Sequence, residues 1–229
     1  MIVPRFTPER CLILTDADVE SLLACAMASE QQTLNSDQPS VLIPAWWGAQ
    51  PDNDLDLIIS AVEPAITRQA RLYALVTDMD NAAYPPEDEP LSELATPRLH
   101  TRLLTEAAYL ALESGIKRVV WPVRIPQNHP SRIKAIGDTL DRAMLVSRAV
   151  SLDATAQTAP EVVIETPFID LSDAQLVDLA RDLTLPIDAC WWADAQTLPL
   201  AQQRRAHWDA ISSRSAAQLE PKPGVQTHA

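Results

Sequence analysis

The fold is decided by one stretch near the start of the chain, Cys11-Leu-Ile-Leu-Thr-Asp-Ala-Asp-Val-Glu-Ser-Leu-Leu-Ala-Cys-Ala-Met27. Four apolar residues, Cys11–Leu14, are enough for a buried parallel strand. A polar turn, Thr15–Asp18, follows, and good helix formers continue from Val19 to Ala28. Strand, tight turn and helix in this order are typical of the start of α/β domains that hold a phosphate or a nucleotide.

The residues of the turn do not suit a phosphate. Backbone N–H groups at a helix N-terminus attract anions, but here Asp16, Asp18 and Glu20 bring three carboxylates to that position. The turn has no glycine, and the whole 229-residue chain has only four. A loop that cradles phosphates normally uses several glycines. The architecture therefore indicates a nucleotide enzyme, whereas the residues argue against triphosphate binding.

Four further apolar segments alternate with helical segments along the chain. We expect these strands at 40–47, 72–77, 119–123 and 161–165. We expect helices at 19–32, 57–71, 97–114, 133–149, 173–182 and 200–212. The alternation predicts a doubly wound, mostly parallel five-stranded α/β sheet with helices on both faces and a short helical C-terminal extension. Gly115 is expected to end the third helix, and Ser172 to cap the fifth.

In such a sheet, ligands lie outside the carboxyl ends of the strands. Here those ends are 15–18, 46–47, 78–80, 122–126 and 165–168. We divide the chain into a nucleotide-binding-type α/β domain at 1–160, a strand–helix segment of the same domain at 161–212, and a tail at 213–229. The acidic, proline-rich stretch 81–97 is expected to be a loop, either functional or a solvent loop.

Composition excludes some partners. A net charge of −13 disfavours broad contact with nucleic acid or an anionic membrane, and the densest basic run is only Gln202–Arg205 with His207. Cys11 and Cys25 stand in apolar surroundings and are expected to be buried. There is no signal-peptide pattern and no apolar run long enough to span a bilayer, so we expect a soluble, cytoplasmic protein.

The segment Glu165-Thr-Pro-Phe-Ile-Asp-Leu-Ser-Asp-Ala-Gln-Leu-Val-Asp-Leu-Ala-Arg-Asp-Leu-Thr-Leu-Pro-Ile187 resembles a known signature. The 7-cyano-7-deazaguanine synthases of queuosine biosynthesis have "TP", "L-S-K-A-E-I-V" and "L-G-V-P" there, followed by Trp-Ser-Cys, and Cys190-Trp-Trp192 stands at that last position. Residues 12–28 resemble the PP-loop strand and helix, S-G-G-x-D-S, of the same N-type ATP pyrophosphatase superfamily. As an order of segments the likeness runs from Cys11 to Trp192, and it is specific mainly over 165–192.

This chain differs from that family at the residues on which the family's chemistry depends. Thr15 can replace the first serine, but both glycines are gone; a one-residue slip places Glu20 and Ser21 on the last two motif positions. The family's zinc site needs four cysteines, of which only Cys190 remains, so zinc is not expected. The family's Tyr-Pro-Asp-Cys-Arg segment appears only as 128–130. The family uses ATP, magnesium and zinc to convert a carboxyl-deazaguanine and ammonia to a nitrile, and the resemblance implies descent from that activity more than possession of it.

The first turn is the candidate cofactor site. Its carboxylates could hold Mg²⁺, which prefers oxygen ligands, or could simply cap the helix and complement its dipole. A third interpretation is the D-x-D pattern of haloacid-dehalogenase-like phosphatases, with Asp16 as nucleophile and Asp18 as acid/base. The cofactor-binding candidates are Thr15, Asp16, Asp18, Glu20 and Ser21.

Two tryptophan pairs are the candidate substrate site. Each lies at or near a strand end, where indole rings could stack on a planar base or could pack in the core. The substrate-binding candidates are Trp46, Trp47, Asp78, Trp191 and Trp192.

Three functions follow, and no catalytic residue is assigned. The first is a degenerate PP-loop protein without ATP-dependent ligase activity, which acts by binding a small planar ligand or a protein partner. The second is an active ATP- and Mg-dependent C–N ligase with an altered loop, and the third is a D-x-D phosphatase. A homodimer is expected only by analogy with the family.

Overall fold

The computed structural model describes residues 9–35, 38–47, 55–84, 95–153 and 161–219. Five strands form one all-parallel sheet in the order β3-β2-β1-β4-β5. The central strand pairs Leu12 with Val41 on one side and with Val119 on the other. The strands are β1 (Cys11–Thr15), β2 (Val41–Pro44), β3 (Val76–Thr77), β4 (Arg118–Val120) and β5 (Val163–Glu165).

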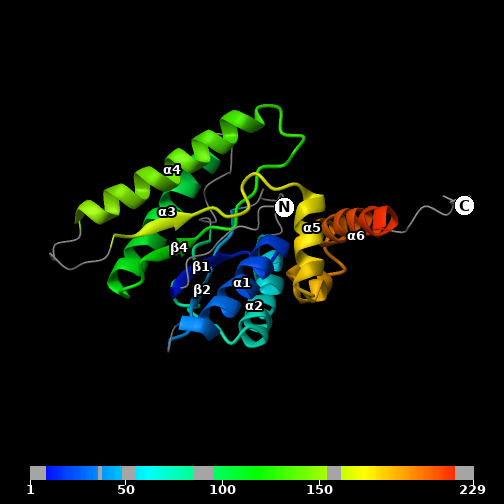
Figure 1. Ribbon diagram of the computed structural model, residues 1–229, viewed down its shortest axis with the longest axis horizontal. Coiled ribbons are helices and arrows are strands. Elements are labelled where there is room, and N and C mark those ends of the chain that lie inside the picture. Colours follow the sequence, from blue (N-terminus) through cyan, green and yellow to red (C-terminus); the bar gives the residue numbers. More distant parts are fainter. Residues whose placement is uncertain (1–8, 36–37, 48–54, 85–94, 154–160, 220–229) are drawn as a thin grey trace, which may run out of the picture.

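Helices cover both faces of this sheet, which confirms the predicted fold class (Figure 1). One face packs against α1 (Val19–Asn35), α2 (Leu55–Leu72) and α5 (Asp173–Asp182). The other packs against α3 (Ala95–Glu113) and α4 (Arg132–Asp153). Two short 3₁₀ helices, η1 (Ile187–Ala189) and η2 (Trp191–Ala193), and the last helix, α6 (Pro199–Leu219), join α5 on the side of α1 and α2.

The strand β1 is buried over its whole length because both of its faces carry apolar side chains. Cys11 and Ile13 face the core beneath α1 and α2, whereas Leu12 and Leu14 face the core beneath α3 and α4. This alternation is the period of two that a strand imposes on its side chains, and it makes β1 the common wall of both cores.

Some boundaries differ from those expected. The helix α2 continues through Pro64 to Leu72, so β3 is reduced to two residues. The helix α6 runs to Leu219, so the tail expected from 213 begins later than predicted. Most of the predicted acidic loop 81–97 and the last residues of the predicted tail, 220–229, lie outside the described residues.

The order of the strands indicates where the ligand-binding crevice of such a fold lies. The chain moves outward from β1 to β2 and β3, then crosses to the other side of β1 at β4. The switch point therefore lies between the carboxyl ends of β1 and β4, beside residues 15–18 and the segment after Val120.

Within the described ranges, no helix has both the length and the apolar character needed to cross a bilayer.

Candidate functional site

The turn after β1 uses its own side chains to satisfy its backbone donors. Asp16 N donates to Ser21 Oγ at 3.2 Å, and Ala17 N donates to Thr15 Oγ1 at 3.1 Å. Asp18 N donates to Asp16 Oδ1 at 3.1 Å, and Val19 N donates to Asp18 Oδ1 at 2.8 Å. Four consecutive N–H groups, which in a phosphate-binding turn would face the anion, thus already have oxygen acceptors.

The carboxylate of Asp18, just before α1, is bound by side chains from the C-terminal part of the chain. Asp18 is buried, and its Oδ1 accepts a hydrogen bond from Trp192 Nε1 at 2.9 Å. Its other oxygen, Oδ2, lies 3.5 Å from Arg204 Nε, on α6. A backbone hydrogen bond connects the same two segments, since Trp191 N donates to Ala17 O at 3.1 Å. The C-terminal segment therefore closes over the first turn.

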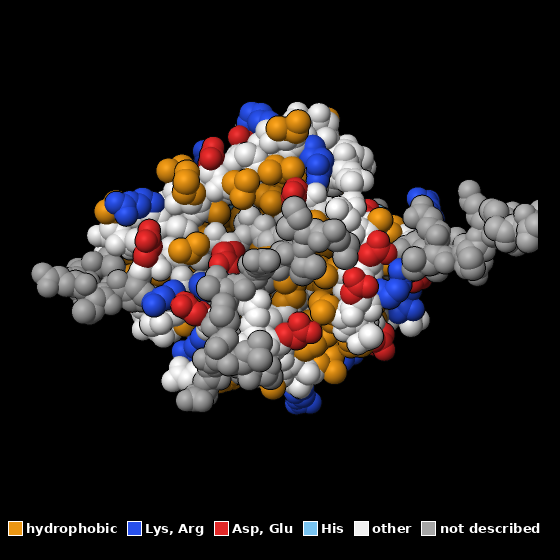
Figure 2. Space-filling model, in the orientation of Figure 1, with side chains coloured by type: hydrophobic (Ala, Val, Ile, Leu, Met, Phe, Trp, Pro, Cys, Tyr) orange, Lys and Arg blue, Asp and Glu red, His pale blue; other side chains and the backbone are white. Residues whose placement is uncertain are grey.

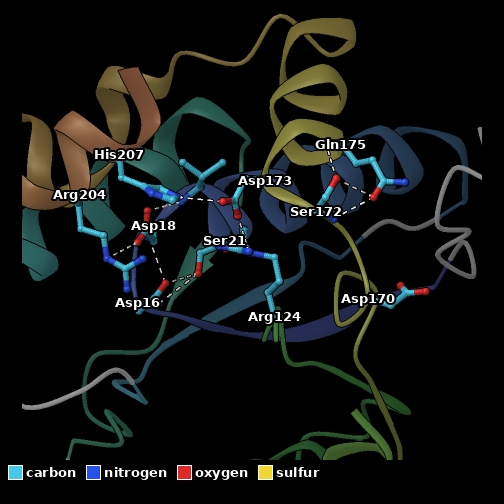
Figure 3. Close-up of polar contacts among 12 residues, drawn as sticks. Asp16, Asp18, Ser21, Arg124, Asp170, Ser172, Asp173, Gln175, Arg204 and His207 are labelled. Atoms are coloured by element: carbon cyan, nitrogen blue, oxygen red, sulfur yellow. Dashed lines mark hydrogen bonds and ion pairs between the residues drawn. The ribbon is translucent and has the colours of Figure 1, made fainter. Parts of the chain in front are cut away.

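Arg124 links the turn to α5 across the switch point. It follows β4, and its Nε donates to Glu20 Oε1 at 2.8 Å while Nη1 forms an ion pair with Asp173. Its guanidinium carbon lies 5.8 Å from the ring centre of Trp208 on α6. His207 Nε2 completes the chain of contacts at 3.2 Å from Asp173 Oδ2. Figure 3 shows Arg124, from the loop after β4, together with Asp173 of α5 and His207 of α6.

Burial changes the acidity of this cluster. Desolvation, together with the charges of Asp18 and Glu20, raises the pKa of Asp16 to about 7. Desolvation and Asp18 also raise the pKa of Glu20, which Arg124 partly offsets. The pKa of Arg204 is raised, mainly by the charge of Asp18. Burial thus favours the neutral form of both Asp16 and Glu20.

Trp46 and Trp191, one ring from each tryptophan pair, meet inside the core. The rings of Trp46 and Trp191 lie edge to face with centroids 5.9 Å apart, and both side chains are almost fully buried. Trp192 is buried as well, and Trp47 packs at the edge of the opposite core. Trp46, Trp191 and Trp192 therefore pack in the core in this conformation. A planar base could stack on one of them only if its ring face became accessible.

Asp78, the remaining substrate-site candidate, lies apart from the tryptophans. It follows the edge strand β3, and its carboxylate accepts hydrogen bonds from Asn81 at 3.3 Å and 2.8 Å. Together with Asp80 and Leu110 it lines a cavity of about 440 Å³ on the α3 side of the sheet. The fold does not bring it to the first turn.

The carboxylates of the turn point to different partners. Asp16 accepts from Ser21 Oγ at 2.7 Å, Asp18 faces Trp192, and Glu20 faces Arg124. Among the described residues, no group of three or more His, Cys, Asp or Glu side chains is placed to hold a metal ion. Cys190 is fully buried, and desolvation raises the pKa of its thiol well above the ordinary value.

Sequence reasoning missed most of the partners in this cluster. Arg124 stands within 122–126, the expected carboxyl end of the fourth strand, but nothing local singled it out. Asp173 follows the expected cap Ser172, and Arg204 and His207 belong to the densest basic run. Position at a strand end and local charge were the only signals available for them.

No protein-family model and no curated protein sequence matches the chain. Among solved structures, the chain is similar to the U34-tRNA thiolase NcsA from Methanococcus maripaludis with its [4Fe-4S] cluster. The two share 11% identity over 95% of this chain and 74% of that one, with a TM-score of 0.45.

Proposed function

We propose that this protein is a non-catalytic relative of the PP-loop ATP pyrophosphatases, descended from a deazaguanine-synthase-like ancestor, and that it works by binding a protein partner. The observation that carries the proposal is the closed first turn. Its four backbone N–H groups are bound to Ser21, Thr15, Asp16 and Asp18. A triphosphate would have to displace these acceptors and approach the buried carboxylates of Asp18 and Glu20.

The backbone supports descent from a glycine-containing loop. Ala17, which aligns with the second glycine of S-G-G-x-D-S, has a φ of 58°. Thr184, which aligns with the glycine of "L-G-V-P", has a φ of 51°. Glycine adopts this left-handed region freely, whereas alanine and threonine do so at a cost. Both positions keep a conformation that suits the residue of the family signature.

The buried tryptophans favour a protein partner over a small planar ligand. A stacking site needs an accessible ring face, but Trp46 and Trp191 are 2% and 1% exposed. Neither indole N–H group has a hydrogen-bond partner among the described residues, so the described contacts that hold these rings are packing contacts. A ligand would have to separate the C-terminal segment from the first turn before it reached either ring.

The two alternative functions make different demands on the same carboxylates. An altered ligase needs Asp16, Asp18 and Glu20 to share a magnesium ion, but the three side chains point apart. A D-x-D phosphatase needs Asp18 as a mobile acid, but both of its oxygens are engaged, by Trp192 and Arg204. Neither alternative gains support from the geometry.

Titration calorimetry with ATP and Mg²⁺ tests the proposal. We expect no saturable binding up to about 1 mM nucleotide, equivalent to a binding free energy weaker than about −4 kcal/mol. A dissociation constant near 1 µM in the wild-type protein would overturn it and favour the ligase. Hydrolysis of a simple phosphoester that disappears in Asp16→Asn would overturn it in favour of the phosphatase.

A further inference from the structure

A cavity at the edge of the sheet lies apart from the cluster around the first turn. It has a volume of about 440 Å³ and opens between the edge strand β3 and the last turns of α3. The cavity exists because α3 packs mainly against β1, β4 and β5, whereas α2 covers β3 from the opposite face. Val76 of β3 consequently remains 48% exposed. Small-molecule sites in proteins typically measure about 300–1,000 Å³, and this cavity falls within that range.

The cavity carries charges of opposite sign at its two ends. Arg10 lies where the strands begin, and Asp78 and Asp80 lie where β3 ends. Arg10 donates hydrogen bonds to Pro39 O and to Gln38 Oε1, both at 3.0 Å. None of the three charged side chains forms an ion pair with another residue that the structure describes. Each end therefore keeps a charge that a ligand could neutralise.

The lining between the charged ends is largely apolar. Leu12, Val41 and Val76 lie side by side in the register of three neighbouring strands and form the floor. Leu110 of α3 and Ile116 add an apolar wall. An aliphatic ligand that covered this surface would be favoured by the hydrophobic effect.

Thr77 offers backbone groups to a ligand in the cavity that it lines. The N–H groups of its neighbours Val76 and Asp78 donate toward β2, to Ser40 O at 3.1 Å and to Leu42 O at 2.9 Å. Successive residues of a strand direct their backbone groups to opposite sides, so the N–H and C=O of Thr77 face the free edge of the sheet. An extended peptide has the donors and acceptors to pair with both groups.

The register of the strands sets the length of the ligand. Arg10 precedes Leu12 by two residues, and Asp78 follows Val76, which lies in the same row of the sheet, by two residues. At about 3.3 Å per residue, the two ends of the cavity are about 13 Å apart along the strands. The side chains of Arg10 and Asp78 occupy part of that distance. The remainder is about 10 Å, which is the length of an extended tripeptide.

We propose that this cavity binds a free tripeptide with aliphatic side chains. Its ammonium group faces Asp78 and Asp80, its carboxylate faces Arg10, and its side chains cover the apolar floor. For a small ligand in an open site, we expect a dissociation constant on the order of 100 µM. The inference goes beyond the proposed function, because the cavity is separate from the first turn and its ligand is a small molecule.

Titration calorimetry of the full chain with the tripeptide Val-Leu-Val tests the ligand class. The N-acetylated and the C-amidated forms each lack one terminal charge, and each should bind about 10-fold more weakly. No saturable binding of the free tripeptide up to about 5 mM would overturn the proposal. Equal affinity for the acetylated form would also overturn it, because the tail of a protein would then fit as well as a free peptide.

Variants at the two ends test the orientation of the peptide. Asp80→Asn and Arg10→Gln should each weaken binding of the free tripeptide about 10-fold. Asp80→Asn should leave the affinity for the acetylated form unchanged, because that form has no ammonium group to lose a partner. Wild-type affinity for the free tripeptide in both variants would contradict the assigned contacts.

Two further variants locate the binding to the cavity. Ser114 is exposed and lines the cavity, so Ser114→Trp should fill it and abolish binding without disturbing the core. Asp141→Asn is the matched control for Asp80→Asn, because Asp141 is exposed on α4, beside the hydrophobic side chains visible along that helix in Figure 2, and does not line the cavity. The control should bind as wild type does. Undiminished binding by Ser114→Trp would place the peptide elsewhere and overturn the proposal.

Discussion

Trp192 Nε1 donates to Asp18 Oδ1 at 2.9 Å, joining residues 174 positions apart in the sequence. Both side chains are buried. This contact closes the turn that follows β1, and it comes from the segment that follows α5. A hydrogen bond to a buried carboxylate is among the stronger ones in proteins, since it replaces lost hydration. We therefore infer that this hydrogen bond stabilises the packing of the C-terminal segment against the α/β core.

Trp192→Phe should lower the free energy of unfolding by about 1.5–3 kcal/mol, because it keeps most of the ring but leaves Asp18 Oδ1 without its indole donor. Urea unfolding followed by circular dichroism measures the change. Trp208→Phe is the control, since Trp208 is also buried and its Nε1 has no hydrogen-bond partner among the described residues. Equal losses in the two variants would mean that the indole–carboxylate contact contributes nothing specific.

Arg124→Met should destabilise the protein by about 3–5 kcal/mol, because it leaves the carboxylates of Glu20 and Asp173 without their shared cation. The side chains of Arg124 and Glu20 are only 9% and 11% exposed, so solvent cannot replace the lost partner. Urea unfolding again provides the measurement.

Two further variants separate charge from packing at Arg124. Adding Glu20→Gln to Arg124→Met should recover part of the loss, because the amide needs no counter-charge. Arg102→Met, which breaks the exposed pair with Glu106, should change stability by less than about 1 kcal/mol. If Arg124→Met were as mild as Arg102→Met, the buried ion pair would have no structural role.

The stability of the protein should fall as the pH rises from about 4 to about 7. The pKa of Asp16 is raised from 3.8 to about 7 in the folded state, so the folded protein binds more protons than the unfolded chain within that window. The contribution of Asp16 to stability is therefore greatest near pH 4 and declines as the pH rises to about 7. Above that pH it no longer changes. The raised pKa of Glu20 acts in the same direction.

Asp16→Asn should flatten this dependence by more than about 1 kcal/mol between pH 5 and pH 8, because asparagine keeps an oxygen acceptor for Ser21 Oγ and Asp18 N but cannot ionise. Urea midpoints across the pH range give the measurement. Asp209→Asn on the exposed surface of α6 is the control and should keep the wild-type slope. Identical slopes in wild type and Asp16→Asn would show that Asp16 does not ionise abnormally.

Thr184→Gly should stabilise the protein by about 0.5–1 kcal/mol. Thr184 follows Leu183, the C-cap of α5, and has a φ of 51°, a conformation that a β-branched residue adopts at a cost larger than the entropy glycine loses on folding. Gly115→Ala is the converse test, since its φ is 65° and an added Cβ would meet nothing within 4 Å. It should destabilise by about 1 kcal/mol through backbone strain alone. Thermal unfolding of both variants checks these opposite signs.

The local structure of the chain could be predicted because it depends on short-range patterns. The apolar run at Cys11–Leu14 became β1, and the helix expected at 173–182 has those bounds. The predicted Ser172 cap is part of a capping box with Gln175, and Gly115 has the left-handed backbone expected of a helix end. Propensity, periodicity and capping act within a few residues, so the sequence by itself determined the order of elements and the class of fold.

Only the tertiary structure decided which groups the acidic side chains of the first turn contact. Three acidic residues at a helix start are compatible with a magnesium site, a helix cap or a phosphatase motif, and local sequence does not distinguish these. Their contacts come from Arg124, Trp192 and Arg204, which reach the turn from three distant segments. Parallel strands bring their carboxyl ends to one edge of a sheet whatever their separation in sequence, and which cation or donor then faces a buried carboxylate is settled by packing in three dimensions.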